Sequence, residues 1–242
     1  PTPDLVSELL GLYKTSRKSL LAKYIAYLLD MMDYRLFNGW TEIIRFELGV
    51  ITDGQIYAGS AMVNRVKQTL SGIMRGTGSP EVIERLLADI EREKEKKYQQ
   101  FKDNQDHHLR LFREKNVMVP KWNFEEFYQQ GFALKIRQYL IKDLIERGGR
   151  DATEERINQF LDNPQAYPYF YVSCRVFMAM FYRHVVLGRG VDEGDNYDQY
   201  HLIYSAKTDY LITNDRRLQE FGADVFQNRS KVIPLSDLLD IV

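Results

Sequence analysis

The sequence predicts an α/β protein that carries a large helical insertion. From about residue 163 onward, short strand-like runs alternate with helix-like runs, whereas residues 41–165 show helical periodicity almost throughout. The chain has 242 residues, of which 44% are hydrophobic and 28% charged, and this is enough for a domain with a sizeable core. We therefore expect one domain over residues 1–242, with the insertion at about 41–165 and the α/β segment at about 166–242.

Composition excludes several classes of protein. The net charge is -1, so any contact with nucleic acid must come from a local patch. A single cysteine, Cys174, excludes a disulfide framework and fits a reducing compartment. No apolar run approaches the ~18 residues that cross a bilayer, and the motifs GxGxxG, GxSxG, HExxH and CxxC are absent. We expect a cytoplasmic protein without a membrane segment.

The first 40 residues leave one assignment open. Leucines between residues 5 and 12 have helical spacing, and a basic turn follows at residues 14–18. The run Ser19–Tyr24 fits a short strand equally well as the start of a helix that continues to Met32, because length does not separate the two for so short a run.

The insertion is predicted to be helical. Ser79-Pro80-Glu81 is typical of a helix start, since serine caps the exposed N–H groups and proline is tolerated at the first position. The stretch Glu91–Lys97 is polar on every side, which indicates a solvated helix. Another helix ends at Gly148-Gly149, and Asp151-Ala152-Thr153-Glu154 starts the next with capping-box chemistry.

The C-terminal segment supplies the α/β pattern. We expect helices at 172–186, at 198 to about 207, from 215 onward and at 236–241, with strands at 210–213 and 231–233. Strands that alternate with helices indicate parallel pairing through crossover connections.

Two carboxylates flank the first of these strands. Asp198 opens the helix that leads into the strand, and Asp215 follows the strand directly. Because the strand runs back antiparallel to that helix, both residues return to the same edge of the sheet, where ligands of such sheets gather. Two carboxylates at one edge repel each other unless a cation lies between them, and Mg²⁺ favours a few carboxylates plus water. Each aspartate taken singly also reads as an ordinary helix cap.

These residues resemble a known family. The stretch from Asp198 to Asp215, followed by VIPLSDLL at residues 232–239, is similar to the C-terminal half of a PIN domain. PIN domains are metal-dependent nucleases in which acidic residues gather at one edge of a parallel sheet. The resemblance implies that Asp198 and Asp215 are metal ligands, and that Thr213 is the hydroxyl that often accompanies them.

The other acids of the family have no clean counterpart. The family's first strand should end in an aspartate, and Asp53 is the nearest imitation, although it also reads as a helix cap. Alternatively, that strand lies upstream of Pro1. Ser19–Tyr24 and the residues after it then resemble the second strand and its acid-bearing helix, which makes Asp30 the next acid, with Asp33 as a rival.

The resemblance implies an endoribonuclease that uses Mg²⁺ or Mn²⁺. Asp198, Asp215 and Asp30 would hold the ion, with Thr213 beside them. By position, His201, one helical turn after Asp198, could touch RNA or be a packed core histidine. Arg216 and Arg217, beside Asp215, could hold phosphates or be ordinary surface arginines. The alternative is a non-catalytic binding or scaffold protein that uses the helical insertion as an interface with a protein partner. A small-molecule phosphohydrolase ranks last, because its DxDxT-type motif is absent.

Overall fold

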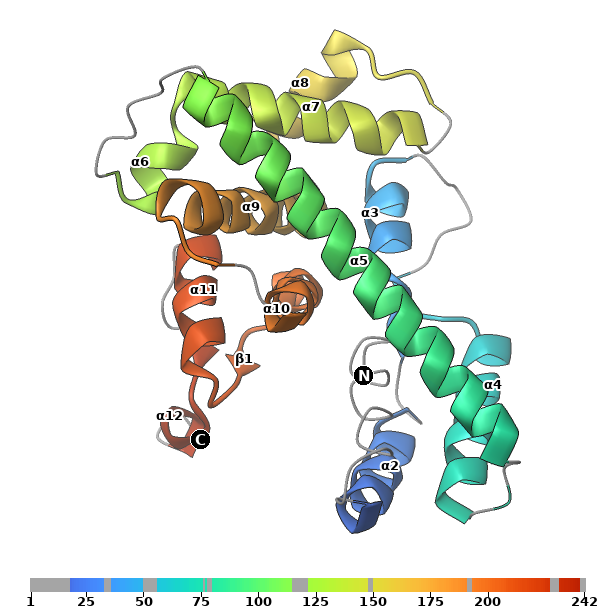
Figure 1. Ribbon diagram of the computed structural model, residues 1–242. Coiled ribbons are helices and arrows are strands. Elements are labelled where there is room, and N and C mark those ends of the chain that lie inside the picture. Colours follow the sequence, from blue (N-terminus) through green and yellow to red (C-terminus); the bar gives the residue numbers. More distant parts are fainter. Residues whose placement is uncertain are drawn as a thin grey trace. The chain divides into compact units, whose positions relative to one another are not determined.

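The computed structural model describes most of the chain, and the described part is mostly helical (Figure 1). It covers residues 18–32, 36–49, 56–75, 77, 80–114, 122–147, 150–190, 193–226 and 231–239. The chain divides into two compact units: unit 1 comprises Pro1–Ile43 and Asp53–Gln99, and unit 2 comprises Ile44–Thr52 and Gln100–Val242. No helix in the described ranges is long and apolar enough to cross a membrane.

The expected α/β fold with a PIN-like sheet is wrong. Within the described residues the sheet consists of β1 (Leu211–Ile212) and β2 (Val232–Ile233), and almost everything else is helix. The run Ser19–Tyr24, a candidate second strand, lies inside helix α2 (Lys18–Met32). The physical reason is that Ile25 and Leu28 follow it at helical spacing and both are buried, so the run continues one amphipathic helix.

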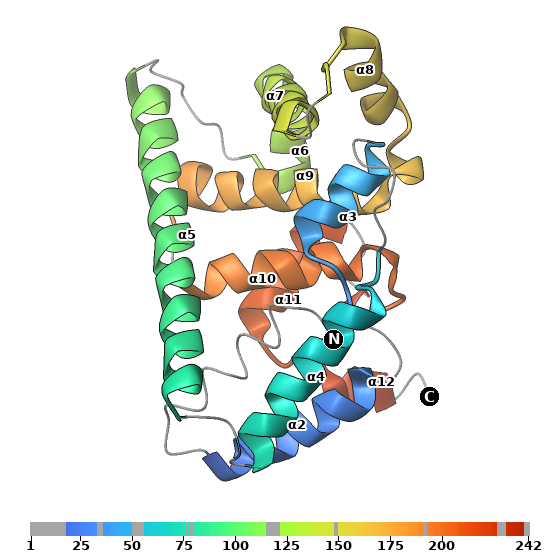
Figure 2. The ribbon, with the colours of Figure 1, turned by 90° about the vertical axis from the view of Figure 1, so that its right-hand side faces the viewer.

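Unit 1 is built around helix packing. It contains α2, the start of α3 (Trp40–Glu47), α4 (Ser60–Arg75) and the first part of α5 (Pro80–Glu114). Helix α2 packs against α4 (Figure 2), and buried residues on both helices, among them Leu28 and Leu70, supply the apolar contact. An isolated antiparallel bridge joins Phe37 to Tyr57.

Helix α5 begins at Pro80, as the sequence predicts. The described side chains of its charged stretch, namely Glu91, Arg92, Glu95 and Lys96, are exposed. The expectation of a solvated segment is therefore met for these residues.

Unit 2 gathers around one buried helix. Helix α9 (Pro168–Phe181) packs against α7 (Gly131–Arg147), α10 (Glu193–Tyr204) and α11 (Arg216–Phe226), and Figure 2 shows α9 and α10 side by side. Its residues Val176, Met178 and Ala179 are fully buried. The remaining elements of unit 2 are α6 (Phe124–Tyr128), α8 (Glu154–Asp162), η2 (Pro164–Ala166), η3 (Tyr182–Val186), η4 (Ser205–Lys207) and α12 (Leu235–Leu239).

A side chain distant in sequence caps the start of α9, and a turn of π-helix continues its end. Glu47 accepts hydrogen bonds from the N–H groups of Tyr169, at 3.2 Å, and Phe170, at 2.8 Å, and so caps the start of α9. Helix α9 passes without a break into η3, a single turn of π-helix in which the Leu187 N–H donates to the Tyr182 carbonyl at 3.0 Å. Such turns are rare and often lie near functional sites.

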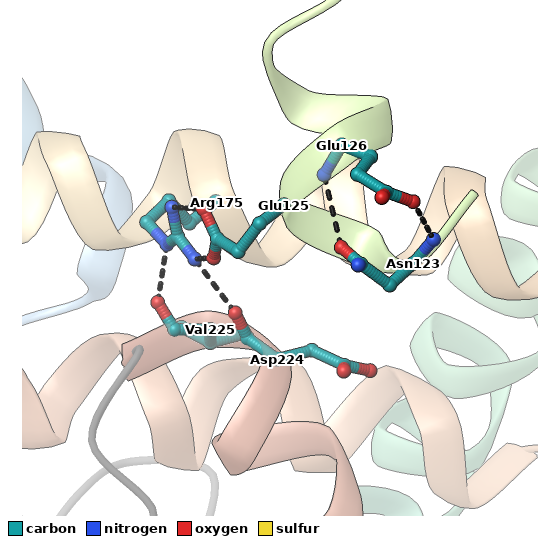
Figure 3. Close-up of polar contacts among 6 residues, drawn as sticks. All are labelled: Asn123, Glu125, Glu126, Arg175, Asp224 and Val225. Atoms are coloured by element: carbon teal, nitrogen blue, oxygen red, sulfur yellow. Dashed lines mark hydrogen bonds and ion pairs between the residues drawn. The ribbon is translucent and has the colours of Figure 1, made fainter.

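Arg175 joins three helices at the centre of unit 2 (Figure 3). Its side chain is 1% exposed, pairs with Glu125 of α6, and donates to the carbonyls of Asp224, at 2.7 Å, and Val225. Those carbonyls belong to the last turn of α11, so the guanidinium satisfies a helix end that would otherwise be buried unpaired. Arg175 thereby ties α9 to both α6 and α11.

The expected parallel pairing of the two strands is confirmed. Leu211 pairs with Val232 and Ile212 with Ile233, and α11 is the crossover between the strands. Helix α11 lies very close to β2, because a Cβ at Gly222 would stand 2.3 Å from Cγ2 of Val232.

Candidate functional site

Asp215 is held rigidly at the junction between β1 and α11. Its Oδ1 accepts hydrogen bonds from the N–H groups of Arg217, at 2.8 Å, and Leu218, at 3.2 Å, so it caps α11. The Asp215 N–H in turn donates to Oγ1 of Thr213 at 3.1 Å. Both capping bonds use Oδ1, and Asp215 is exposed.

Asp198 lies within helix α10 and not at its start. The helix begins at Glu193, five residues earlier than the sequence predicts. The cap interpretation therefore does not apply to Asp198. Residues three apart share a helix face, so Asp195, Asp198 and His201 form one row on α10.

The pKa of Asp198 is raised to about 6. Burial is the main cause, and the negative charge of Asp215 is the next. The charge of Asp195 raises this pKa further, whereas the positive charges of His201 and Arg217 lower it. The structure thus brings Asp198 and Asp215 close enough for their charges to interact, with Asp195 as a third carboxyl beside them.

Asp195 joins the row to two basic side chains. One oxygen of Asp195 lies 3.4 Å from a terminal nitrogen of Arg217, and the other lies 3.7 Å from Nε2 of His184. Nδ1 of His184 lies 2.9 Å from the carbonyl of Arg189. A carbonyl can only accept, so Nδ1 carries the proton of this hydrogen bond.

The remaining candidates from the sequence are placed as follows. Thr213 supports the Asp215 main chain, and His201 acts on Asp198 through its charge. The side chain of Arg216 is 90% exposed and pairs with Glu220, one turn further along α11, at 3.3 Å. Asp30 is exposed on α2 in unit 1, whereas Asp198 and Asp215 belong to unit 2. Asp53 and Asp33 lie outside the described residues.

The donor set fits a weakly held divalent cation. Two interacting carboxylates from α10 and the end of β1 are the hard oxygen ligands that Mg²⁺ takes when substrate phosphates and water complete its coordination. In the described part of the chain, no group of three His, Cys, Asp or Glu side chains is arranged to hold a metal ion. Asp198 and Asp215 therefore do not form a complete cage, and water or a substrate oxygen would have to complete the coordination of an ion there.

A groove of about 1030 Å³ also opens in unit 2. Among its lining residues are Tyr182, Arg183, Arg189, Gln219 and Asp224, and none of the carboxylates Asp195, Asp198 and Asp215 lines it. Arg183 is already paired with Asp224 at 3.0 Å. The groove contains none of the carboxylates Asp195, Asp198 and Asp215, which together we call the acidic row, and its charged residues Arg183 and Asp224 already pair with each other. We therefore assign the chemistry to the acidic row.

Sequence reasoning missed Asp195 and His184. Asp195 lies three residues before Asp198, so a helix traced back by one turn would have placed both on one face. His184 is in the π-helical turn after α9, and no local pattern signals its meeting with a residue of α10. Of the two arginines after Asp215, Arg217 contacts Asp195, whereas Arg216 pairs with Glu220.

No family model, curated protein or solved structure matches this chain.

Proposed function

We propose that the protein is a metal-dependent endoribonuclease that hydrolyses RNA phosphodiester bonds at Asp198 and Asp215 of the acidic row. The observation that carries the proposal is the raised pKa of Asp198, about 6, which burial causes first, and to which the charge of Asp215 after β1 and the charge of Asp195 on the same helix contribute. Carboxyls that disfavour each other's charge are stabilised by a cation, and they cluster at functional sites more than elsewhere. The proposal rests on this row and does not depend on a PIN-like sheet.

Asp198 and Asp215 would hold Mg²⁺ or Mn²⁺, and Asp30 is kept as the third candidate ligand from the sequence. A bound ion would supply an activated water molecule and neutralise charge on the phosphate. The chain's own contribution is orientation: two N–H groups of α11 and the hydroxyl of Thr213 fix Asp215, as their distances of 2.8, 3.2 and 3.1 Å indicate. His201 lies on the same face of α10 and acts to lower the pKa of Asp198.

RNA is chosen among phosphodiesters because residues 198–215 and 232–239 resemble the C-terminal half of PIN domains. A reducing, cytoplasmic location belongs to the same proposal, since Cys174 is buried as a thiol and burial raises its pKa to about 12. Such a thiol is inert, so it does not suggest a covalent mechanism.

The test is cleavage of a single-stranded RNA oligonucleotide by the purified chain. Cleavage should require Mg²⁺ or Mn²⁺, stop with a chelator and return with excess ion. Asp215→Asn should abolish it without unfolding the protein, because asparagine is also a good helix cap. Asp209→Asn, at an exposed carboxylate in the turn before β1, is the matched control and should cut normally.

The competing proposal is a non-catalytic protein that binds a protein partner through the helical insertion. It predicts either that no RNA is cleaved or that cleavage is unchanged in Asp215→Asn. Unchanged cleavage would come from a contaminating nuclease. Asp30→Asn in the same assay decides whether Asp30 belongs to the site. If the variant loses as much activity as Asp215→Asn, Asp30 is a ligand of the ion, and if it cuts like the wild type, Asp30 is not part of the site.

A further inference from the structure

We propose that the groove of unit 2 binds a small amphipathic anion, a molecule with an acidic group on an apolar body, and that the guanidinium of Arg189 binds the acidic group. The inference goes beyond the proposed function and does not depend on it. The groove has a volume of about 1030 Å³, and small-molecule sites have volumes of about 300–1,000 Å³. The groove is therefore large enough for such a molecule.

The apolar side chains that line the groove are partly open to water. Leu187, directly after η3, is 45% exposed, and Tyr210, directly before β1, is 40% exposed. The buried strand residues Val232 and Ile233 line the same groove. Exposed apolar side chains that gather in a concave site are typical of ligand sites, because a bound apolar group removes them from water. The groove thus offers a surface for the apolar body of the ligand.

The carboxylates that line the groove already have partners within the chain. Asp224 pairs with Arg183 at 3.0 Å, and Glu220 pairs with Arg216 at 3.3 Å. Asp237 accepts a hydrogen bond from the neighbouring serine hydroxyl at 3.1 Å and lies in the first turn of α12, where a helix favours negative charge. The lining acids therefore do not call for a cationic ligand.

Arg189 is a lining cation without such a partner. Its side chain makes no hydrogen bond and no ion pair with any residue that the structure describes. Burial raises the pKa of Asp224, and the charges of Arg183, Arg189 and Arg175 lower it, so three arginines act on one carboxyl. Arg183 pairs with Asp224 and Arg175 with Glu125, which leaves the charge of Arg189 unmatched. A guanidinium has a planar fork that fits the oxygens of an acidic group.

The main chain holds Arg189 in place at the groove. Its N–H donates to the carbonyl of Arg183 at 3.0 Å, and its carbonyl lies 2.9 Å from Nδ1 of His184. Gly188, with φ +62°, allows the turn between η3 and Arg189. Because these hydrogen bonds use only main-chain groups of Arg189, a change of its side chain leaves them intact.

The test is a titration of the full chain with the fluorescent dye 8-anilinonaphthalene-1-sulfonate, which joins an anionic sulfonate to aromatic rings. Arg189→Gln should weaken binding of the dye about 3–5-fold, as expected for one exposed charge pair. Arg189→Lys should recover part of the loss, because it restores the charge and not the fork. Added NaCl should weaken binding by the wild type more than binding by Arg189→Gln, since salt screens the charge pair.

Matched variants separate the groove from the rest of the surface. Leu187→Ser should weaken dye binding about 2–4-fold through lost apolar contact. Leu134→Ser, at a leucine of α7 that is 38% exposed and does not line the groove, should stay within about 1.5-fold of the wild type. Arg150→Gln, at another exposed arginine outside the groove, should do the same. Thermal melts show whether each variant folds.

Competition with the dye identifies the acidic group of the ligand. Octanoate and octyl phosphate carry one apolar chain with a carboxylate or a phosphate, and octanol carries that chain without a charge. The anion that displaces the dye at the lower concentration has the preferred acidic group. Octanol should displace the dye about 3–5-fold less well than that anion. This difference should disappear in Arg189→Gln, because the anion then has no guanidinium to bind.

Four results would overturn the inference. The folded wild type does not bind the dye, Arg189→Gln and Arg150→Gln weaken binding equally, Leu187→Ser and Leu134→Ser weaken it equally, or octanol displaces the dye as well as the anions do. If Arg189→Gln does not fold, Arg189→Lys and Leu187→Ser decide, and wild-type binding by both would also overturn it.

Discussion

Asp215, fixed at the start of α11, raises the pKa of Asp198 on α10. The two residues are 17 positions apart, and the strand between them brings the chain back so that their charges interact. Burial of Asp198 adds to the same effect and is the larger cause. An ionised Asp198 is therefore a source of instability in the protein without metal.

The first prediction concerns Asp198→Asn and the pH dependence of stability. The folded pKa, about 6, is above the ordinary value of 3.8, so the folded protein keeps a proton that the unfolded chain releases between about pH 4 and 6. The contribution of this group to stability is complete below pH 4 and is lost as the pH rises to about 6. Removing the charge should therefore stabilise the protein at pH 7.5, by about 1–2 kcal/mol after allowance for solvent screening.

Urea unfolding in the presence of a chelator, at pH 4 and at pH 7.5, measures this difference. The gain should be much smaller at pH 4, where the folded wild-type carboxyl is protonated and the unfolded one is close to its pKa of 3.8. Asp106→Asn, at an exposed residue of α5, is the control and should change neither curve. An Asp198→Asn variant less stable than the wild type at pH 7.5 would show that the ionised carboxylate has a stabilising partner.

The second prediction concerns Arg175. Replacement by alanine removes the ion pair with Glu125 and leaves the carbonyls of Asp224 and Val225 without their donor. We expect a loss of about 3–5 kcal/mol, as for other broken buried pairs. Arg175→Lys should recover little, because one ammonium group does not replace a planar fork. Denaturant unfolding measures both, and Arg216→Ala should stay within about 0.5 kcal/mol of the wild type, since that ion pair is exposed.

The third prediction concerns the close approach of α11 to β2. Alanine is the better helix former by about 1 kcal/mol, yet its Cβ at position 222 would lie 2.3 Å from Cγ2 of Val232. The steric effect should win, and Gly222→Ala should destabilise the protein by about 1–3 kcal/mol. Val232→Ala removes the clashing methyl group, so the double variant should be more stable than the sum of the two single changes indicates. If the effects of the two changes on stability are strictly additive, the methyl group of Val232 does not clash with residue 222 and the close approach of α11 to β2 is contradicted.

The sequence predicts local features of this protein well. The parallel pairing of the strands follows from the order strand, helix, strand along the chain. The starts of α5 at Pro80 and of α8 within the stretch Asp151–Glu154 follow from residues within a few positions of each other. Asp215 is in the same group, because a strand end followed by a helix cap is a local pattern.

The fold class was not predictable in the same way. Strands of two residues are too short for their sequence to show how many strands the sheet has. The run Ser19–Tyr24 fits both a strand and a helix, and the packing of α2 against α4 decides for the helix. The site shows the same limit, since the meeting of His184 with Asp195 and of Arg175 with Glu125 depends on how α9 packs. Contacts of this kind are set by the whole core of unit 2.

The last prediction joins the raised pKa of Asp198 to the proposed metal requirement. A carboxyl must be ionised to bind a cation, so protons compete with Mg²⁺ for Asp198 below its pKa of about 6. At low Mg²⁺, the rate of RNA cleavage should fall about tenfold for each pH unit below 6. Saturating Mg²⁺ should restore much of the rate at pH 5, because the cation displaces the proton. If the loss at pH 5 instead persists at every Mg²⁺ concentration, the group that titrates acts on the reaction itself and Asp198 is not the ligand.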